Sequence, residues 1–345
     1  MTGSREMKTH MHIAVVGCGM SGSILSYLLP EAGHNVDVFE INQTPKVVCA
    51  CGMSSDLFRR TASICELEPD NYILWYGKEM IVKFSTREHA LKVKNLCTFD
   101  KLKFESDLMR KSKACFHFGK ILHPQKYSDF DLVIDATGVR ACLGRLPSDR
   151  FYVCYQVKAS FEHLPHPDYY MEFARLGEMY RWMFPLSSST AYVGAGARDG
   201  PSARAAALEF MQHFNGKILE EKGKLLRLAP PDRSMPFHNG NVVGVGNSIG
   251  SITSLGEGIG PSIETAMLLS ENLYDLDGYQ KKVMKKLGWI RYDYRIFNYL
   301  SKNEKIRTAY SIFRCRRHYQ ESFSLSFKQI LEAVVSVGRS KRSAR

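Results

Sequence analysis

Three glycines near the start of the chain have the type and spacing that bind a phosphate group. Gly17, Gly19 and Gly22 lie in the segment VVGCGMSG, between a strand predicted over residues 12–16 and a helix predicted over residues 23–32. The first glycine permits a tight turn, the second lets a pyrophosphate approach the backbone, and the third lets helix and strand pack closely. The free N–H groups and the dipole of the helix N-terminus attract the phosphates. We therefore expect a dinucleotide at this loop.

An acidic residue at the end of the next strand supports this interpretation. Residues 35–40 read as a second strand, and Glu40 ends it. A carboxylate about twenty residues after the glycines is placed to bind a ribose hydroxyl. The alternative is a glycine-rich turn that binds nothing, and the position of Glu40 argues against it. The loop alone does not distinguish NAD from FAD.

A second glycine-rich segment, within residues 242–266, indicates a flavin. It reads VVGVGNSIGSITSLGEGIGPSIETA, a buried strand and a turn followed by a helix predicted to start at Pro261. Backbone N–H groups at a helix start can stabilise negative charge on a reduced isoalloxazine ring. A plain NAD dehydrogenase is not expected to carry such a segment. The expected cofactor is FAD.

Three further motifs, added to these two segments, make the chain resemble a known family. They are the pair Cys51-Gly52 after the second strand, DLVIDATG at residues 131–138, and YRWMFP at residues 180–185 followed by AYVGAG. The third is the most specific, because it matches the pattern YxWxFP. The chain resembles the geranylgeranyl reductase family, within the flavoproteins that share a p-hydroxybenzoate hydroxylase-like fold.

The resemblance implies a role for each set of residues. It implies that FAD is bound by the two glycine segments, the acidic residue and the DATG turn, through Gly17, Gly19, Gly22, Glu40, Ala136, Gly138, Gly246, Asn247, Gly258, Ile259 and Gly260. It implies a catalytic Cys51-Gly52 loop near the flavin. It implies substrate contacts from Tyr180, Trp182, Phe184 and Pro185. Asn247 stands where the family usually has an aspartate, which removes a negative charge beside the cofactor.

The implied activity is reduction of isolated C=C bonds in prenyl (geranylgeranyl) chains of membrane lipid precursors, by hydride transfer from reduced flavin. Only one dinucleotide fingerprint is seen, so the electron donor is expected to be external, either ferredoxin or a reduced nicotinamide. Three alternatives remain. They are a prenyl reductase acting on a quinone or chlorophyll-type substrate, a flavin monooxygenase of the same fold, and a non-catalytic electron carrier that binds flavin or lipid.

The predicted catalytic cysteine and the predicted substrate-binding aromatic residues also have plain structural interpretations. Cys51 could be an inert buried thiol, as most free cysteines are, and Cys49 is expected to be a bystander. Tyr180, Trp182 and Phe184 alternate along one strand and would point to the same face. They could be core aromatics or the wall of an apolar pocket. The motif favours the pocket wall.

The formal net charge of +12 implies an anionic partner. The basic and aromatic region from residue 276 onward could contact an anionic membrane or be a solvated helical face. Nucleic-acid binding fits poorly, because the charge is spread out and no recognition motif is present. No histidine or cysteine spacing is typical of a metal site, so no metal is expected. Without a secretory signal, the nine cysteines predict a cytoplasmic protein, with peripheral contact at the inner face of the membrane.

The expected fold is α/β, with a Rossmann-like FAD-binding domain, an inserted β-rich substrate domain and a helical C-terminal region. The FAD-binding domain comprises residues 12–71, 105–150 and 236–275, and the substrate domain comprises residues 72–104 and 151–235. Residues 1–11 are expected to be a disordered leader, and residues 276–345 a basic helical region. A helix is predicted over residues 104–118 from its apolar spacing.

Overall fold

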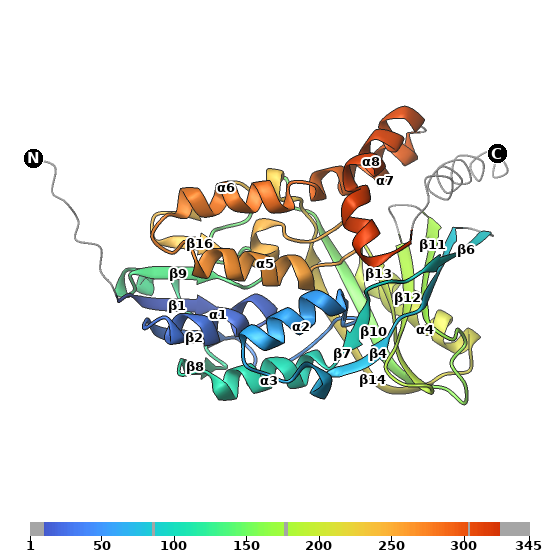
Figure 1. Ribbon diagram of the computed structural model, residues 1–345, viewed down its shortest axis with the longest axis horizontal. Helices are drawn as coiled ribbons and strands as arrows, with labels where there is room; N and C mark the ends of the chain where they lie inside the picture. Colours follow the sequence, from blue (N-terminus) through green and yellow to red (C-terminus); the bar gives the residue numbers. More distant parts are fainter. Residues whose placement is uncertain (1–9, 85–86, 176–178, 303, 325–345) are drawn as a thin grey trace, which may run out of the picture.

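The computed structural model describes residues 10–84, 87–175, 179–302 and 304–324. Two sheets, each with its own helices, lie side by side along the molecule, and the C-terminal helices lie over the region between them (Figure 1). Most of the expected leader and residues 325–345 of the basic C-terminal region lie outside the described residues. The expected α/β fold is confirmed.

The first part is built on a six-stranded sheet with the order β15-β16-β9-β1-β2-β8. All of its pairings are parallel except that of β15 with β16. Its strands are β1 (His12–Val16), β2 (Asn35–Glu40), β8 (Cys115–Phe118), β9 (Leu132–Asp135), β15 (His238–Asn239) and β16 (Val242–Gly244). The central strands are short apolar runs, such as LVID in β9, because both of their faces are covered.

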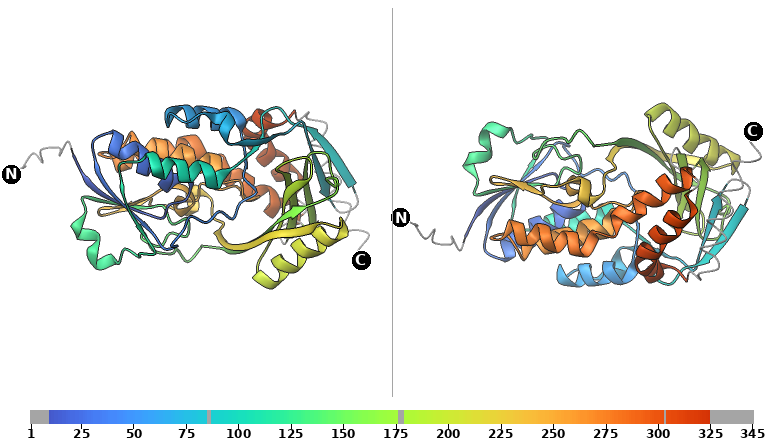
Figure 2. Two further views of the ribbon diagram at one scale, coloured as in Figure 1. Left: turned by 90° about the horizontal axis from the view of Figure 1, so that it is seen from below. Right: turned by 90° about the horizontal axis from the view of Figure 1, so that it is seen from above.

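Helices cover one face of this sheet (Figures 1 and 2). They are α1 (Met20–Glu31), α2 (Ser55–Ile64), α3 (Lys101–Lys111), α5 (Ile259–Ser270) and α6 (Leu276–Leu287). Helix α1 packs between α3 and α5, and the main apolar core lies between these helices and the sheet. The other face is covered by the 3₁₀ helix η2 (Pro124–Asp129) and its flanking residues, with Leu122 packed on Ala14 and Val133.

The helix predicted over residues 104–118 is wrong in its extent. Helix α3 starts at Lys101, because the side chain of Asp100 accepts a hydrogen bond from the N–H of Lys103 at 3.0 Å and caps the helix. It ends before Ser112, whose backbone is extended. Residues 115–118 then form the edge strand β8, which pairs with β2. The aromatic pattern CFHF favours this strand over another helical turn.

The second part is built on a seven-stranded sheet with the order β14-β10-β13-β12-β11-β5-β6. Its strands are β5 (Glu79–Phe84), β6 (Arg87–Lys92), β10 (Phe151–Ser160), β11 (Tyr169–Arg175), β12 (Met179–Pro185), β13 (Thr190–Ala197) and β14 (Lys217–Arg227). Helix α4 (Gly200–His213) packs on β10 and β13. A separate three-stranded sheet contains β3 (Gly52–Met53), β7 (Cys97–Phe99) and β4 (Ile73–Tyr76). Residues 72–104 are therefore divided between two sheets.

Helices α7 (Ile290–Ser301) and α8 (Lys305–Ser322) form the C-terminal end of the described chain. The end of α8 is tied to the seven-stranded sheet, because the N–H of Lys94 donates to the carbonyl of Ser322 at 2.9 Å. Phe323 adds a β-bridge to Val93. Among the described residues, the model contains no helix with the length and apolarity needed to cross a bilayer.

Candidate active site

A cavity of about 1350 Å³ lies between the two parts of the molecule. One wall is formed by the glycine loop and by the residues that follow β1, β2 and β9. The opposite wall is formed by β12 and its neighbouring strands, and residues of α8 close one end. Sites for small molecules usually measure about 300–1,000 Å³. The cavity is therefore larger than a single ligand of ordinary size requires.

The glycine loop has the geometry that its spacing predicts. Gly17 has φ of +98°, and a Cβ atom there would come within 2.6 Å of the carbonyl oxygen of Ala136. At Gly22, which does not line the cavity, a Cβ would lie 2.0 Å from the carbonyl oxygen of Gly17. Gly19 has no atom within 4 Å of such a position and faces the cavity. Two glycines thus allow close packing, and Gly19 leaves space for a ligand.

The end of α1 next to this loop is open to the cavity. Gly19 is the N-cap residue of α1, and no described side chain forms a capping hydrogen bond there. The carboxylate of Glu40 accepts hydrogen bonds from the N–H of Cys18 at 3.0 Å and the N–H of Asn42 at 2.9 Å. These bonds fix Glu40 beside the loop, where it lines the cavity. A helix N-terminus with a carboxylate held to one side suits a pyrophosphate and its ribose.

The turn after β9 and the 3₁₀ helix η4 (Gly246–Ile249) meet at the same wall. Ala136 and Gly138 line the cavity, and the N–H of Gly138 donates to Ser248 Oγ at 3.0 Å. Asn247 also lines the cavity, and its Oδ1 is buried without a hydrogen-bond partner in the described part of the chain. A buried acceptor of this kind is costly unless a ligand group pairs with it. Asn247 therefore marks a place for a donor such as a ligand hydroxyl.

Two buried arginines hold η4 in this position. Arg227 is fully buried and forms an ion pair with Asp149 at 2.6 Å. Its guanidinium also donates to the carbonyl of Asn247 at 3.2 Å. Arg140 donates to the carbonyls of Ser248 and Pro236 at 3.3 and 2.8 Å. The backbone on either side of the unpartnered Asn247 amide is thereby fixed.

The start of α5 completes the wall near η4. The helix begins at Ile259, two residues before the predicted start at Pro261, with Gly258 as its N-cap. Gly258 and Ile259 line the cavity, whereas Gly260 does not and instead packs close to Leu57. Gly246 is also outside the lining, where its N–H donates to Thr265 Oγ1 at 3.0 Å.

The aromatic residues of β12 form the opposite wall. Tyr180, Trp182 and Phe184 line the cavity, whereas Pro185 does not. Tyr180 lies opposite Gly196 of β13, and Trp182 lies opposite Gly194. A Cβ atom at Gly194 would come within 2.2 Å of the Trp182 ring. The glycines of the AYVGAG segment thus let the aromatic rings lie flat over β13.

Pairing registers across this sheet place polar groups among the aromatic rings. Lys224 of β14 lies opposite Cys154 of β10, which lies opposite Gly196 and thus next to Tyr180. All of these residues except Gly196 line the cavity. Beyond Tyr180 most lining residues are apolar, namely Met80, Val82, Leu91, Met171 and Phe173, and Glu88 and His89 of β6 line the same part. The cavity therefore has one basic region and one long apolar region.

The Cys49–Cys51 loop lies against β12. Cys51 has φ of +60° and is buried, and its thiol donates to the carbonyl of Cys49 at 3.1 Å. A Cβ atom at Gly52 would lie 2.3 Å from the ring of Phe184, so Gly52 permits this close contact. Burial raises the pKa of Cys51. Hydrogen bonding from Cys51, assisted by the charge of Lys101, lowers the pKa of Cys49 to about 6 despite its burial.

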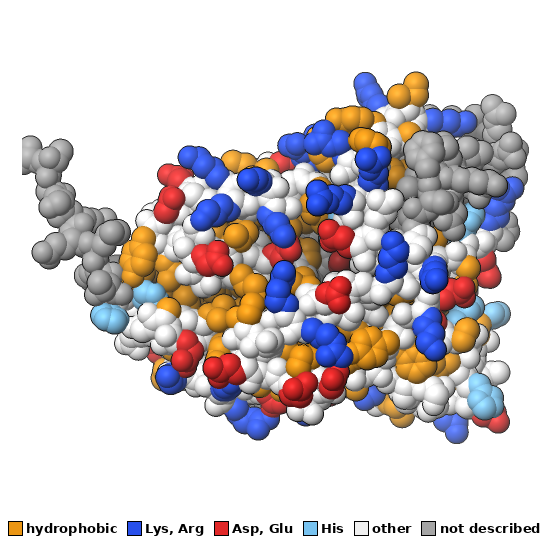
Figure 3. Space-filling model, in the orientation of Figure 1, with side chains coloured by type: hydrophobic (Ala, Val, Ile, Leu, Met, Phe, Trp, Pro, Cys, Tyr) orange, Lys and Arg blue, Asp and Glu red, His pale blue; other side chains and the backbone are white. Residues whose placement is uncertain are grey.

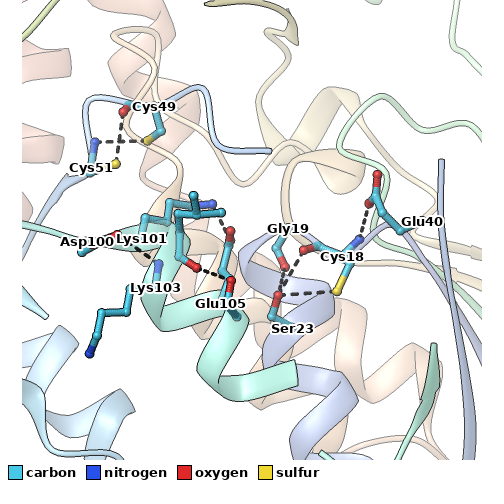
Figure 4. A network of polar contacts seen from close by, with 12 residues as sticks. Cys18, Gly19, Ser23, Glu40, Cys49, Cys51, Asp100, Lys101, Lys103 and Glu105 are labelled. Atoms are coloured by element: carbon cyan, nitrogen blue, oxygen red, sulfur yellow. Dashed lines mark hydrogen bonds and ion pairs between the residues drawn. The ribbon is translucent and has the colours of Figure 1, made fainter. Parts of the chain in front are cut away.

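An ion pair lies between this loop and the glycine loop (Figure 4). Lys101 and Glu105 of α3 form a hydrogen-bonded i,i+4 pair whose side chains are largely buried. Burial opposes the charge on Lys101, but Glu105 and Cys49 outweigh it and raise the lysine pKa. Lys101 also lines the cavity. It thus presents an ammonium group to a ligand bound beside the glycine loop.

Helix α8 closes one end of the cavity with a second charged group. His318 and Tyr319 line the cavity, and His318 Nε2 lies 3.8 Å from a carboxylate oxygen of Glu257. Burial opposes protonation of His318, but Glu257 outweighs it and raises the imidazole pKa. The Trp289 ring stacks on His318 with centroids 3.7 Å apart. His318 is therefore held next to Gly258, at the start of α5.

Solved structures that share this arrangement include flavin-dependent enzymes. A geranylgeranyl bacteriochlorophyll reductase-like protein from Thermoplasma acidophilum matches with a TM-score of 0.65 at 15% identity, over 95% of this chain and 91% of that one. PqsL, a probable FAD-dependent monooxygenase from Pseudomonas aeruginosa, matches with a TM-score of 0.63 at 14% identity, over 88% of this chain and 99% of that one. The chain has the FAD-binding fold of these proteins.

A flavin-dependent halogenase, CmlS, shares the same fold with a TM-score of 0.61 at 13% identity, over 95% of this chain and 70% of that one. No protein-family model matches the sequence, and no curated protein matches it either. The expected flavoprotein fold is confirmed. At 13–15% identity the likeness shows a shared fold and does not show a shared reaction.

The FAD-binding fold brings most of the predicted site residues to one cavity, but several lining residues have no motif. Gly22, Gly246, Gly260 and Pro185 support the wall without lining it. Lys101, Lys224 and His318 line it and were not predicted. The only sequence signal for Lys101 was its place one residue after the helix-capping Asp100. Lys224 reaches the cavity because of the register of the seven-stranded sheet, and His318 because of the position of α8. Patterns in a single sequence specify neither.

Proposed function

We propose that the protein is an FAD-dependent oxidoreductase that reduces isolated C=C bonds in prenyl (geranylgeranyl) chains of membrane lipid precursors. The observation that carries this proposal is the position of β12. Its three aromatic side chains face the same cavity as the glycine loop, and Phe184 lies against Gly52. The Cys-Gly loop and the YxWxFP strand are far apart in sequence and line one cavity.

The residues of the first wall fit FAD. The N-terminus of α1 and Gly19 would bind the pyrophosphate, Glu40 the adenosine ribose, and the unpartnered Asn247 Oδ1 a hydroxyl of the ribityl chain. The start of α5, capped only by Gly258, would place its N–H groups toward the flavin ring. Bound and reduced, FAD supplies a hydride to an acceptor. Lys101 would add a positive charge near the anionic part of the cofactor.

The second wall fits a long apolar substrate. The cavity continues past Tyr180 into the region lined by Met80, Val82 and Met171. An apolar chain gains free energy on leaving water in proportion to the area it buries. The polar lining residues of this part, Glu88 and His89 of β6, are outnumbered by apolar ones. An extended hydrocarbon with double bonds is the substrate class that this shape and chemistry favour.

The residues of the site would manage the proton that accompanies the hydride. The Cys51 thiol keeps its proton, because burial raises its pKa and its S–H is held on the Cys49 carbonyl. Cys49 carries the negative charge of the pair. His318, paired with Glu257, is a further proton-bearing group at the cavity. The aromatic rings and α8 would exclude water from the reacting carbons.

The electron donor would be a separate molecule, either ferredoxin or a reduced nicotinamide. The net charge of +12 favours association with an acidic protein such as a ferredoxin. The same charge supports a peripheral contact with anionic lipid, which would place the protein where a prenylated lipid is found. No role in binding nucleic acid is proposed.

Helix α8 supplies the surface for that membrane contact. Ile306, Tyr310 and Phe313 are exposed and recur at i, i+4 and i+7 on the outer face of the helix. Basic residues surround them, namely Lys302, Lys305, Arg307, Arg314, Arg316 and Arg317. Figure 3 shows Lys, Arg and hydrophobic side chains together over α7 and α8. The inner face of the same helix closes the cavity, which gives a short route for a lipid chain.

A flavin monooxygenase is the second candidate, because PqsL matches over 99% of its own length. A prenyl reductase acting on a quinone or a chlorophyll-type molecule would use the same site, and a non-catalytic electron carrier would keep the flavin without turnover. These candidates differ in what reoxidises the reduced flavin. A monooxygenase would consume oxygen and reduced nicotinamide, whereas a reductase would transfer electrons to an alkene without oxygen.

The test uses the purified protein loaded with FAD and reduced by dithionite without oxygen. A geranylgeranylated glycerophospholipid is then added. Flavin reoxidation with a product heavier by multiples of two hydrogens would support the proposal. A flavin that is reduced but not reoxidised by the lipid would refute the assignment of a prenylated membrane lipid as substrate. A chain that binds no FAD would refute the cofactor assignment as well. The Trp182→Ala variant should slow lipid turnover while retaining the flavin.

A further inference from the structure

Four residues with metal-binding side chains lie on one face of the six-stranded sheet, away from the cavity. In the register of β1 and β2, Ala14 lies opposite Asp37, so His12 and Asp37 point to the same face. Asp37 lies opposite Cys115 of β8, and His117 lies two residues further along that strand. None of the four lines the cavity. Three adjacent strands therefore bring together two imidazoles, a carboxylate and a thiol.

The distances within this group are short. His117 Nε2 lies 2.6 Å from one carboxylate oxygen of Asp37, and His12 Nε2 lies 2.7 Å from the other. The ligand atoms of Asp37, Cys115 and His117 all lie within 4.8 Å of one another. The side chain of His12 is 39% exposed, that of His117 is 35% exposed and that of Asp37 is 20% exposed. Cys115 is exposed as well. An ion from solvent can reach them.

Aromatic neighbours orient both imidazole rings. Phe39 stacks on the ring of His117 with centroids 4.7 Å apart, and Phe130 lies against the ring of His12 at 4.6 Å. These contacts direct each Nε2 toward Asp37. A binding site gains affinity when its ligands are already oriented, because less conformational entropy is lost on binding.

We propose that Cys115, His117 and Asp37 bind a transition-metal dication, with Zn²⁺ as the expected ion, and that His12 orients the Asp37 carboxylate. A thiolate with an imidazole and a carboxylate is a donor set that suits Zn²⁺ and not Mg²⁺ or Ca²⁺. With bonds of about 2.0–2.3 Å, the ligand atoms of a tetrahedral Zn²⁺ site lie about 3.4 Å apart. Partly exposed side chains can make the adjustment of about an ångström that this requires.

The position of this group indicates a structural role for the ion. It would join β2 and β8, and His12 would link β1 to the ion through Asp37. Strand β1 leads directly into Gly17, and β2 ends at Glu40. The alternative is a plain hydrogen-bonded cluster in which Asp37 bridges two histidines. Cys115 distinguishes the two, because such a cluster has no need of a thiol. The proposal is independent of the reaction assigned to the cavity.

The experiment uses the full chain, freed of metal with a chelator that is then removed. Co²⁺ and Zn²⁺ are titrated separately. We expect one equivalent of Co²⁺ to give the visible bands of a tetrahedral site and a thiolate-to-cobalt absorption, and Zn²⁺ to displace it. Cys115→Ser should abolish the thiolate absorption and weaken Zn²⁺ binding at least tenfold. His12→Ala should weaken it about 10–100-fold, as for outer partners of metal ligands.

The matched control is His163→Ala, which removes an exposed histidine elsewhere and should leave binding unchanged. A second measurement needs no variant. Zn²⁺ should protect Cys115 of the unaltered protein from alkylation, as located by peptide mass spectrometry. Absence of saturable binding, binding unaffected by Cys115→Ser, or alkylation of Cys115 at the same rate with and without Zn²⁺ would each overturn the proposal.

Discussion

The thiols of Cys49 and Cys51 lie two residues apart and differ in acid–base character. Cys51 donates its S–H to the carbonyl of Cys49, and the N–H of Cys51 lies 3.4 Å from Cys49 Sγ. Hydrogen bonding from the Cys51 side chain and the charge of Lys101 lower the pKa of Cys49, and the second contact adds to them. The positive φ of Cys51 contributes to this arrangement, because rotation about its N–Cα bond sets where the thiol lies relative to residue 49.

Cys49 should therefore react as a thiolate at neutral pH. Its pKa is lowered to about 6, so the thiolate is present above this pH and lost as the pH falls through it. The rate of alkylation by iodoacetamide should rise around pH 6 and level off by pH 7, whereas an ordinary cysteine titrates near about 8.5. Peptide mass spectrometry would locate the label. In Lys101→Gln the rise should move to higher pH, and a rate still increasing through pH 8 in the unaltered protein would contradict the assignment.

Residues that act through the shape of the backbone, such as the loop glycines, were predicted from the sequence. Residues that act through their charge, such as Lys101, were mostly not predicted. Gly17 and Gly22 could be placed because their spacing along one loop encodes the close contacts they permit. The Cys49–Lys101 pairing could not be predicted, because it joins a loop to the start of α3. The cluster at Asp37 was missed for the same reason. Its residues are separated along the chain and meet through strand pairing.

The aromatic wall of the site depends on a pair of neighbouring strands. Two aromatic rings of β12 lie over glycines of β13, Tyr180 over Gly196 and Trp182 over Gly194. A side chain on β13 would lift the ring and narrow the cavity. The two sequence segments therefore act as one unit, with the glycines determining how the aromatics lie.

Replacing Gly194 with alanine should disturb both stability and the site. The new Cβ would come within 2.2 Å of the Trp182 ring and 2.8 Å of the Tyr155 carbonyl oxygen, and backbone cannot easily move aside. Overpacking of this kind usually costs about 1–3 kcal/mol. Urea unfolding would measure the loss, and tryptophan fluorescence the movement of the ring. Gly200→Ala is the control, because its nearest neighbour would be at 3.9 Å. Equal stability of the two variants would contradict this account.

The buried ion pair between Arg227 and Asp149 supports the position of η4. Arg227→Met would leave the carboxylate of Asp149 without its partner, although that side chain is only 3% exposed. Loss of one member of a buried pair usually costs about 3–5 kcal/mol. The variant should unfold at much lower urea and bind FAD more weakly, since η4 carries Asn247. Arg204→Met breaks an exposed pair with Glu221 and should cost less than about 1 kcal/mol. A similar small loss for Arg227→Met would argue against the proposed support.

Helices and strands were predicted well where the nearby sequence marks their ends, and poorly where it does not. The order of the strand–loop–helix–strand unit at the start of the chain was predicted correctly, because glycines mark each end of α1, but the helix starts at Met20 and not at residue 23. The helix over residues 104–118 was not, since an apolar spacing continues across the boundary between α3 and β8. The division of residues 72–104 between two sheets depends on long-range pairing, for which short segments carry no signal.

For the whole molecule, α8 connects the surface with the cavity. Its inner side carries the buried Thr308, Ser311 and Cys315, and further along it lines the cavity. Its outer side exposes Ile306, which is 87% accessible. A helix that only covered a core would have no use for apolar side chains on its outer side. A basic rim around exposed apolar residues is the pattern of helices that lie on anionic membranes.

The Ile306→Glu/Phe313→Glu double variant tests whether this surface binds lipid. Both side chains are exposed, so their replacement should leave the fold intact while placing negative charge against the bilayer. Sedimentation with phosphatidylglycerol vesicles should show at least tenfold weaker binding by the double variant. Added salt should also weaken the binding of the unaltered protein to the vesicles. Ile218→Glu/Leu219→Glu introduces the same charges at exposed apolar positions of β14 and should have little effect. If both double variants lose binding equally, net charge alone attracts the protein to the vesicles, and α8 is not the contact surface.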